Sequence, residues 1–289
     1  MSRSRVKQTL AVAILGMTLL CGIGAYAIGS ALIAPSPSLV GDLPEDLVGE
    51  SVLIPSESGS LLHAWFVPGR HDAVVLLHGL HASRRNQVER TRLVHGAGYS
   101  VLLFDFQAHG ESPGSNVTFG YLESRDARAA VDYVRRRLPG QKVAVIAQSM
   151  GGAAAILAQP ALAIDALVVE AAYPNLDDAV EDRLMMRLGS WAWVLGPVLT
   201  LQVQPRLGFP ASTLRPIDHV ADLTIPKLFI AGSADEHTRI DESRALFEAA
   251  GAPKIFWAVD GAAHVDFYRY APVEYRQHVL GFLQEYLRQ

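Results

Sequence analysis

The chain has 289 residues, of which 50% are hydrophobic and 19% are charged. This balance is typical of one or two globular domains and excludes a disordered or collagen-like chain. A formal net charge of −4 lacks the positive excess of a nucleic-acid-binding protein, and a single cysteine excludes a disulfide framework or a cysteine-rich metal site within one chain.

The first 34 residues have the pattern of a membrane anchor. Arg3, Arg5 and Lys7 precede a run from Thr9 to Ala34 that contains no charged residue. As a helix this run is about 39 Å long, at about 1.5 Å per residue, and a bilayer core needs only about 20 apolar residues. The next lysine or arginine is Arg70, so the positive-inside rule predicts a cytoplasmic N-terminus and puts the rest of the chain outside the cytoplasm, periplasmic or extracellular.

Two other interpretations of this segment stay open. Ala25-Tyr26-Ala27 offers a site for a signal peptidase, and cleavage there would release a secreted protein. A lipoprotein with Cys21 as the lipidated residue is the third interpretation. It is disfavoured because bulky Leu20 stands where small residues are expected.

Beyond the anchor, short apolar runs alternate with amphipathic segments. Continuous apolar strands predict a sheet that is covered on both faces, and the alternation with helices predicts parallel strands. The first two strands have no helix between them and are expected to pair antiparallel. The expected strands are Ser51–Ile54, Leu61–Val67, Val74–Leu77, Val101–Phe104, Val143–Ile146, Leu167–Val169, Leu228–Ile230 and Ile255–Val259, and the expected helices are Arg84–His95, Ser124–Arg137, Met150–Ala158, Asp241–Ala250 and Val273–Leu287.

One region breaks this alternation. Residues 176–222 lie between two expected strands, and they are neither short nor polar, with Trp191 and Trp193 among them. A loop of this length is usually functional, so we expect a helical cap over the carboxyl edge of the sheet; ordinary core helices are the alternative. The expected organisation is a cytoplasmic segment at 1–8, a transmembrane anchor or signal sequence at 9–34, a linker at 35–46 and one α/β domain at 47–289.

Ser149 lies in the pattern of a nucleophile elbow. The motif AQSMGG at 147–152 follows the expected strand Val143–Ile146 and opens a helix of small residues, with Ala147 in place of the usual glycine. A sharp strand-to-helix turn exposes the serine hydroxyl. The N-terminus of the helix then offers free N–H groups to a developing oxyanion.

A second oxyanion donor is expected from the loop after the third strand, HGLHAS at 78–83. We assign it to the backbone N–H of Leu80, with the N–H of Met150 as its partner. His78 and His81 are three residues apart, but no third ligand stands nearby and no metal site is expected.

The acid and the base are expected at the ends of later strands. Asp235 follows Leu228–Ile230, and His264 follows Ile255–Val259. The chain order Ser149, Asp235, His264 is that of α/β-hydrolases, in which the histidine takes the serine proton and the acid orients the histidine. Other candidates for the acid are Glu170, Asp260 and Asp266.

These motifs make the sequence similar to the α/β-hydrolase superfamily from about Leu47 to the C-terminus. Within it the chain resembles the BEM46-like and prolyl-oligopeptidase-like serine hydrolases, although His109 replaces a usual glycine. The resemblance implies an α/β-hydrolase fold with a mostly parallel eight-stranded sheet, helices on both faces and a helical cap insertion. The motifs are HGLHAS at 78–83, DFQAHGES at 105–112, QSMGG at 148–152, GSADE at 232–236 and GAAH at 261–264.

The residues and the resemblance agree on acyl transfer to water, through an acyl-enzyme on Ser149, without a metal or another cofactor. The expected reaction is cleavage of an ester, a thioester or an amide in a small acyl substrate or peptide. An acyltransferase, a peptidase or a perhydrolase would use the same triad, and a non-catalytic binding protein is a further alternative. The apolar cap favours acyl esters over charged peptides. The expected partners are this substrate and a membrane, through residues 9–34, and no nucleic acid; the oligomeric state stays open.

Overall fold

The computed structural model describes residues 3–287, so residues 1 and 2 of the expected cytoplasmic segment lie outside the described residues. Apolar runs form an eight-stranded sheet in the order β10-β9-β8-β7-β4-β5-β3-β2, and β3 alone runs antiparallel to its two neighbours. The predicted mostly parallel sheet with an antiparallel start is therefore confirmed. The strands are β2 (Glu50–Pro55), β3 (Leu61–Val67), β4 (His71–Leu77), β5 (Tyr99–Phe104), β7 (Val143–Gln148), β8 (Ala166–Glu170), β9 (Lys227–Gly232) and β10 (Lys254–Val259), and a separate short pair joins β1 (Ser36–Pro37) to β6 (His109–Gly110).

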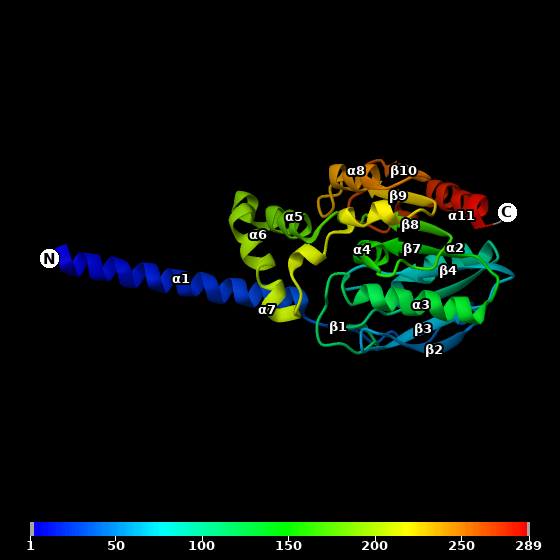
Figure 1. The fold of residues 1–289 in the computed structure, drawn as a ribbon, viewed down its shortest axis with the longest axis horizontal. Coiled ribbons are helices and arrows are strands. Elements are labelled where there is room, and N and C mark those ends of the chain that lie inside the picture. The colour runs from blue at the N-terminus through cyan, green and yellow to red at the C-terminus, as the bar shows by residue number, and fades with distance from the viewer. Residues whose placement is uncertain (1–2, 288–289) are drawn as a thin grey trace.

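Helices cover both faces of the sheet (Figure 1). Side chains alternate along a strand, so Val75 of β4 packs with α3, α4 and α8, while Val74 packs with α2 and α11 on the other face. Each fully buried aliphatic side chain contributes about 1.5–3 kcal/mol. These helices are α2 (Val88–Gly96), α3 (Glu123–Arg137), α4 (Met150–Leu157), α8 (Ile240–Ala249) and α11 (Gly281–Leu287).

The remaining elements differ in part from the expected ones. The helix predicted over Val273–Leu287 contains a π turn at Arg276–Leu280 between two α-helical pieces, and the helix predicted from Arg84 begins with a 3-10 turn. The other elements are α1 (Arg3–Ile33), α5 (Leu176–Leu188), α6 (Ala192–Thr200), α7 (Val203–Leu207), α9 (Phe267–Tyr270), α10 (Pro272–Tyr275), and the turns η1 (Arg84–Gln87), η2 (Gly189–Trp191), η3 (Ala211–Thr213), η4 (Pro216–Asp218), η5 (Val220–Asp222) and η6 (Arg276–Leu280).

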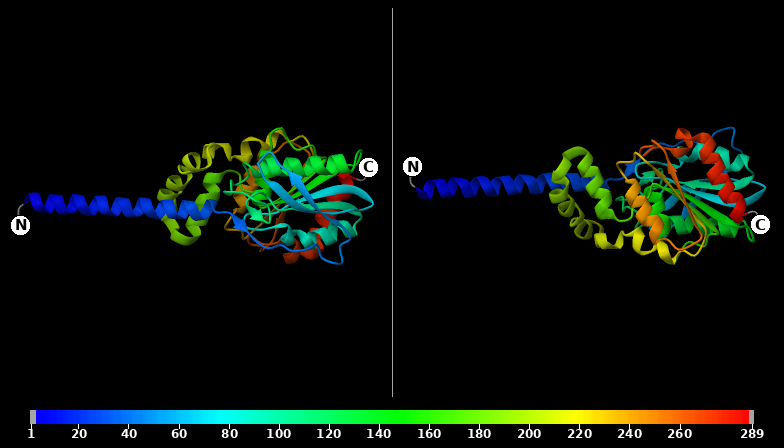
Figure 2. Two further views of the ribbon diagram at one scale, coloured as in Figure 1. Left: turned by 90° about the horizontal axis from the view of Figure 1, so that it is seen from below. Right: turned by 90° about the horizontal axis from the view of Figure 1, so that it is seen from above.

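The region between β8 and β9 is helical, as expected for a cap. Helices α5, α6 and α7 lie at the end of the domain from which α1 departs, and α6 runs across α1 (Figures 1 and 2). Asn175 caps α5 by accepting a hydrogen bond from the N–H of Asp178 at 2.9 Å. The exact limits of the cap as a unit, 176–222, stay a prediction.

The N-terminal helix α1 is joined to this cap by its last turns. The side chain of Gln202 donates to the carbonyl of Ala25 at 3.1 Å, and Arg206 donates to the carbonyl of Tyr26 at 2.7 Å and to the hydroxyl of Ser30 at 2.9 Å. The guanidinium of Arg206 also lies over the Tyr26 ring, 3.9 Å from its centroid. Helix α1 therefore packs against this helical region between β8 and β9.

Two stretches of the described chain are long and apolar enough to cross a membrane. One is Leu15–Ile33 of α1, with a mean hydropathy of 1.7, and the other is the cap stretch Leu176–Leu207. Length and composition alone also fit a signal sequence or a core helix. The transmembrane role expected for residues 9–34 therefore stays a prediction.

A buried ionic network ties β8 to the last helices. Arg90 of α2 donates to Glu170 at 2.7 Å, to Asp266 at 3.0 Å and to the Tyr275 hydroxyl at 3.2 Å, and the Tyr275 hydroxyl donates to the other oxygen of Glu170. The side chains of Arg90 and Glu170 are 2% and 0% exposed. Removing one partner of such a pair leaves the other charge buried and poorly compensated.

We therefore expect Glu170→Gln to lower the free energy of unfolding by about 3 kcal/mol. The matched control is Glu50→Gln, which breaks the ion pair with Arg137 whose side chains are 48% and 50% exposed, and it should cost less than about 1 kcal/mol. Urea unfolding of both variants measures the difference. Equal losses in the two variants would contradict the role given to the buried network.

Candidate active site

Ser149 stands on a tight turn between β7 and α4. Its backbone has φ +50° and ψ −116°, which is a rare conformation for a residue other than glycine, and its N–H donates to the carbonyl of Glu170 at 2.7 Å. A Cβ at Gly151 would lie 2.7 Å from the carbonyl oxygen of His78, so the close approach of α4 to β4 needs a glycine there. The strand–serine–helix turn expected from the motif is present.

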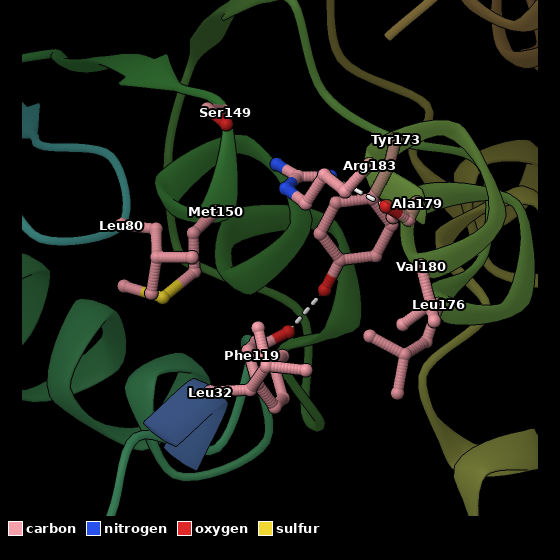
Figure 3. A pocket seen from close by; sticks show the side chains of 10 residues that line it. All are labelled: Leu32, Leu80, Phe119, Ser149, Met150, Tyr173, Leu176, Ala179, Val180 and Arg183. Carbon is pink, nitrogen blue, oxygen red and sulfur yellow. Dashed lines mark hydrogen bonds between the residues drawn. The ribbon is translucent and has the colours of Figure 1, made fainter. Parts of the chain in front are cut away.

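The two expected oxyanion donors lie beside this serine. Leu80 and Met150 both line the pocket that contains Ser149, and Figure 3 shows them together below it. Within residues 3–287, neither backbone N–H has a hydrogen-bond acceptor in the structure. Met150 opens α4, where the first N–H groups of a helix have no partner inside the helix and carry the positive end of its dipole. Both amides are therefore free to bind an anionic oxygen.

His78 holds the loop that carries Leu80. Its Nε2 accepts from the N–H of Phe106 at 3.1 Å, so its Nδ1 carries the proton and donates to the carbonyl of Gly79 at 2.7 Å. Burial, with His109 nearby, lowers the pKa of His78 to about 3. The neutral ring therefore holds the loop through hydrogen bonds at both of its nitrogens. Neither nitrogen is free to bind a metal ion together with His81. The position of His78 directly after a strand gave no signal for this role.

Asp235 and His264 meet at the ends of β9 and β10. His264 Nδ1 lies 2.7 Å from Asp235 Oδ2, and the Asp235 side chain is fully buried. The other oxygen of Asp235 accepts from the N–H groups of His237 and Thr238 at 2.8 and 3.0 Å. An ionised carboxylate in this position orients the His264 ring with Nδ1–H as donor, and it leaves Nε2 as the free base.

Ser149 and His264 line one cleft, together with Leu80, His81 and Arg183. The structure shows no hydrogen bond between the serine and the histidine within the described residues. Catalytic hydrogen bonds often tighten only when substrate binds. The structure thus brings all three expected triad residues to one region, with the Asp235–His264 contact formed.

The three rival acids are occupied elsewhere. Glu170 and Asp266 bind Arg90, and Asp266 also caps α9 by accepting from the N–H of Tyr268 at 3.0 Å. Asp260 accepts from the hydroxyl of Ser233 at 3.3 Å. None of these contacts involves His264.

The pocket beside Ser149 has features that the sequence did not indicate. Its walls are apolar, and one of them is Leu32 of α1 (Figure 3). The guanidinium of Arg183, on α5, points toward Ser149 (Figure 3). Arg183 donates to the carbonyl of Ala179 at 2.7 Å, and within residues 3–287 no carboxylate lies close enough to form an ion pair with it. Burial lowers the pKa of Arg183.

A carboxyl pair joins the cap to α8 close to the Asp235 loop. Arg239 lies 3.2 Å from an oxygen of Asp182 on α5 and 3.1 Å from an oxygen of Glu242 on α8. Burial, with Asp182 beside it, raises the pKa of Glu242 to about 7, and burial also raises the pKa of Asp182. The contact between α5 and α8 therefore contains a carboxyl group that ionises near neutral pH.

Comparison with known proteins finds a matching family and several relatives of this chain. Residues 69–214 match the family described as serine aminopeptidase, S33. The uncharacterized protein YqkD of Bacillus subtilis is 23% identical over 246 residues, which are 83% of this chain and 80% of YqkD. WAV2 of Arabidopsis thaliana, an α/β hydrolase domain-containing protein, is 24% identical over 253 residues, which are 83% of this chain and 80% of WAV2.

Solved structures share the fold. The esterase Pf2001 of Pyrococcus furiosus superposes with a TM-score of 0.72 at 23% identity, covering 88% of this chain and 98% of the esterase. XC6422 of Xanthomonas campestris, described as a serine hydrolase without a lid, has a TM-score of 0.60 at 18% identity and covers 86% of this chain and 99% of its own. Because the family match spans about half of the chain and includes the turn at Ser149, the protein belongs to the serine aminopeptidase S33 family of α/β hydrolases.

Proposed function

We propose that the protein is a serine hydrolase that cleaves an ester bond with the triad Ser149, His264 and Asp235. The observation that carries the proposal is the 2.7 Å contact between His264 Nδ1 and the buried Asp235, in the cleft that also contains Ser149. This contact fixes the tautomer in which Nε2 can accept a proton. The family supports a hydrolase, and the triad roles are the proposal's own.

The reaction has two halves. Ser149 Oγ attacks the ester carbonyl while its proton passes to His264 Nε2, and the oxyanion binds the N–H groups of Leu80 and Met150. The C–O bond then breaks, and the leaving alcohol takes the proton from His264. Water attacks the acyl-enzyme, gives its proton to His264, and the acid departs as that proton returns to Ser149. No metal or redox cofactor enters these steps.

The pocket favours an acyl ester over an N-terminal peptide. Leu32, Phe119, Leu176 and Val180 offer apolar contacts to an acyl chain. An aminopeptidase must bind a substrate ammonium group, and the charged side chain in this pocket is Arg183, which repels a cation. A thioester or amide substrate, and transfer to an alcohol instead of water, use the same groups and remain the alternatives.

We expect Ser149→Ala and His264→Ala each to lower kcat by about 10³-fold or more, because triad members act as a unit. Ester hydrolysis and fluorophosphonate labelling measure this. Retained turnover in folded Ser149→Ala protein would contradict the mechanism.

Wild-type kcat/KM should also fall at acidic pH, since the base must be neutral to accept the serine proton.

The identity of the acid has its own control. Asp235→Asn should lower kcat by about 10⁴-fold through the wrong histidine tautomer, whereas Asp260→Asn, also close to His264 in sequence, should leave kcat nearly unchanged. Glu170→Gln should keep its activity per folded molecule. A large loss in Asp260→Asn together with a small loss in Asp235→Asn would reassign the acid.

We further propose that residues 9–34 anchor the enzyme and that the catalytic domain lies outside the cytoplasm. The uncharged run at residues 9–34 and the basic residues that precede this run support this orientation. Cell fractionation with N-terminal sequencing is expected to find the intact chain in the membrane fraction. A soluble form beginning near Ile28 would indicate a secreted enzyme instead.

Protease access tests the orientation. Protease added to cells whose outer barriers have been opened is expected to digest the catalytic domain. Protection until the inner membrane is lysed would reverse the orientation.

A further inference from the structure

The cap exposes a set of large apolar side chains. Residues 188–205 contain no charged residue, and this stretch includes the whole of α6. Soluble monomers rarely expose apolar groups in such concentration unless the surface binds something. The exposed side chains, named here the α6 face, are Met186, Leu188, Trp191, Trp193, Val194, Val198 and Leu201, and Trp191, Trp193 and Leu201 are 68%, 67% and 76% exposed.

The helices α5 and α6, which carry most of the α6 face, lie at the end of the domain from which α1 departs (Figures 1 and 2). The inner side of α6 packs toward α1, with Ala192 and Leu199 in a cluster that includes Ala25 and Leu32. The helix runs across α1 (Figure 1), so it lies along a bilayer surface when α1 crosses that bilayer. Tryptophans are enriched at the interface between membrane and water because their rings are amphipathic.

An apolar route joins this region to the serine. A second pocket, between α1 and the helices α6 and α7, is lined by Gly29, Ile33 and Leu199. It shares Leu32 and Val180, among others, with the pocket that contains Ser149. An acyl chain can therefore contact apolar side chains from the junction of α1 and α6 to the elbow.

We propose that the α6 face inserts into the surface of the bilayer crossed by α1 and that the substrate, a lipid-soluble acyl ester, enters from the lipid between α1 and the cap. The proposed partner of the α6 face is the lipid bilayer, because α1, which contains the candidate membrane span, packs against α6. The substrate part of this proposal rests on the proposed hydrolase function, and the insertion part does not.

Insertion is tested with the full-length protein in vesicles of phosphatidylcholine with and without bromine on the acyl chains. Brominated lipid is expected to quench the tryptophan fluorescence of the wild type and of Trp257→Phe, whose ring stacks on His278 at 4.4 Å. Trp191→Phe/Trp193→Phe should lose most of this quenching. Equal quenching with and without these two tryptophans would overturn the proposal. So would a shift from dimer to monomer in Trp191→Ser/Trp193→Ser, because the α6 face would then be an interface between two copies.

The substrate route has a separate readout. Trp191→Ser/Trp193→Ser should raise KM for a long-chain ester presented in vesicles by about ten-fold, equivalent to about 1.4 kcal/mol, and leave kcat/KM for a short soluble ester unchanged. Equal effects on both esters would overturn entry from the lipid. Absence of all ester hydrolysis in the wild type would instead refute the proposed function and leave the quenching result standing.

Arg183 carries a second, independent inference. A half-buried guanidinium without a carboxylate partner is costly, because the hydrogen bond to the Ala179 carbonyl replaces only part of the water that burial removes. The guanidinium of Arg183 points toward Ser149 in the pocket (Figure 3). Asp182, the neighbouring acid on α5, is turned to Arg239 at 3.2 Å instead. An anion supplied by the substrate would complete the site.

We infer that Arg183 binds a carboxylate or phosphate group of the substrate. The test compares three esters of equal length that end in a carboxylate, a phosphate or a neutral amide. Wild-type kcat/KM should favour one or both anionic esters by about ten-fold or more, as expected for a charged hydrogen bond of about 1.5–3 kcal/mol. Arg183→Met should remove this preference, mainly through KM, and Arg183→Lys should restore part of it.

The three esters separate the possible outcomes. A preference for only one anion identifies its source as carboxylate or phosphate. Equal kcat/KM for all three in the wild type, or an equal fall for all three in Arg183→Met, would overturn anion binding and leave Arg183 a structural residue. Hydrolysis of the neutral ester reports on the proposed function separately.

Discussion

The hydrogen bond from the N–H of Ser149 to the carbonyl of Glu170 is the constraint on which the site depends. A backbone with positive φ at a serine persists only where its surroundings hold it. Here β8 supplies the acceptor, and the side chain of the same Glu170 is held by Arg90 and Tyr275. The end of one strand therefore fixes the elbow with its main chain and the C-terminal helices with its carboxylate.

This arrangement explains why a buried carboxylate stands beside the elbow without taking part in the triad. Both oxygens of Glu170 are already bound, whereas Asp235 has one oxygen on backbone amides and the other on His264. Glu170 is the last residue of β8, and Asp235 follows the neighbouring strand β9; both side chains are buried. Their partners, and not their burial, distinguish the structural acid from the proposed catalytic one.

Much of the fold follows from local sequence. Apolar runs located the eight strands, because a strand in a sheet that is covered on both faces carries apolar side chains toward each face. The ends of these strands indicated Ser149, Asp235 and His264 as candidate site residues. What the sequence could not reveal depends on contacts between distant segments. Three features arise only from how loops and helices meet in the folded chain. They are the hydrogen bonds by which His78 holds the Leu80 loop, the place of Arg183 beside Ser149, and the position of Leu32 in the pocket wall. The π turn at Arg276–Leu280 has no signal in a continuous helical pattern.

The position of Leu32 gives the N-terminal helix a second structural role. A segment with the sequence pattern of a membrane anchor or signal sequence also forms part of the wall of the pocket beside Ser149. A peptidase that cut after Ala27 would leave Gly29, Leu32 and Ile33 attached to the domain, whereas a recombinant form begun after Ala34 would lack all three. The shorter form would lack these residues from the walls of the two neighbouring pockets. Its selectivity would then describe the trimmed protein rather than the one that cells make.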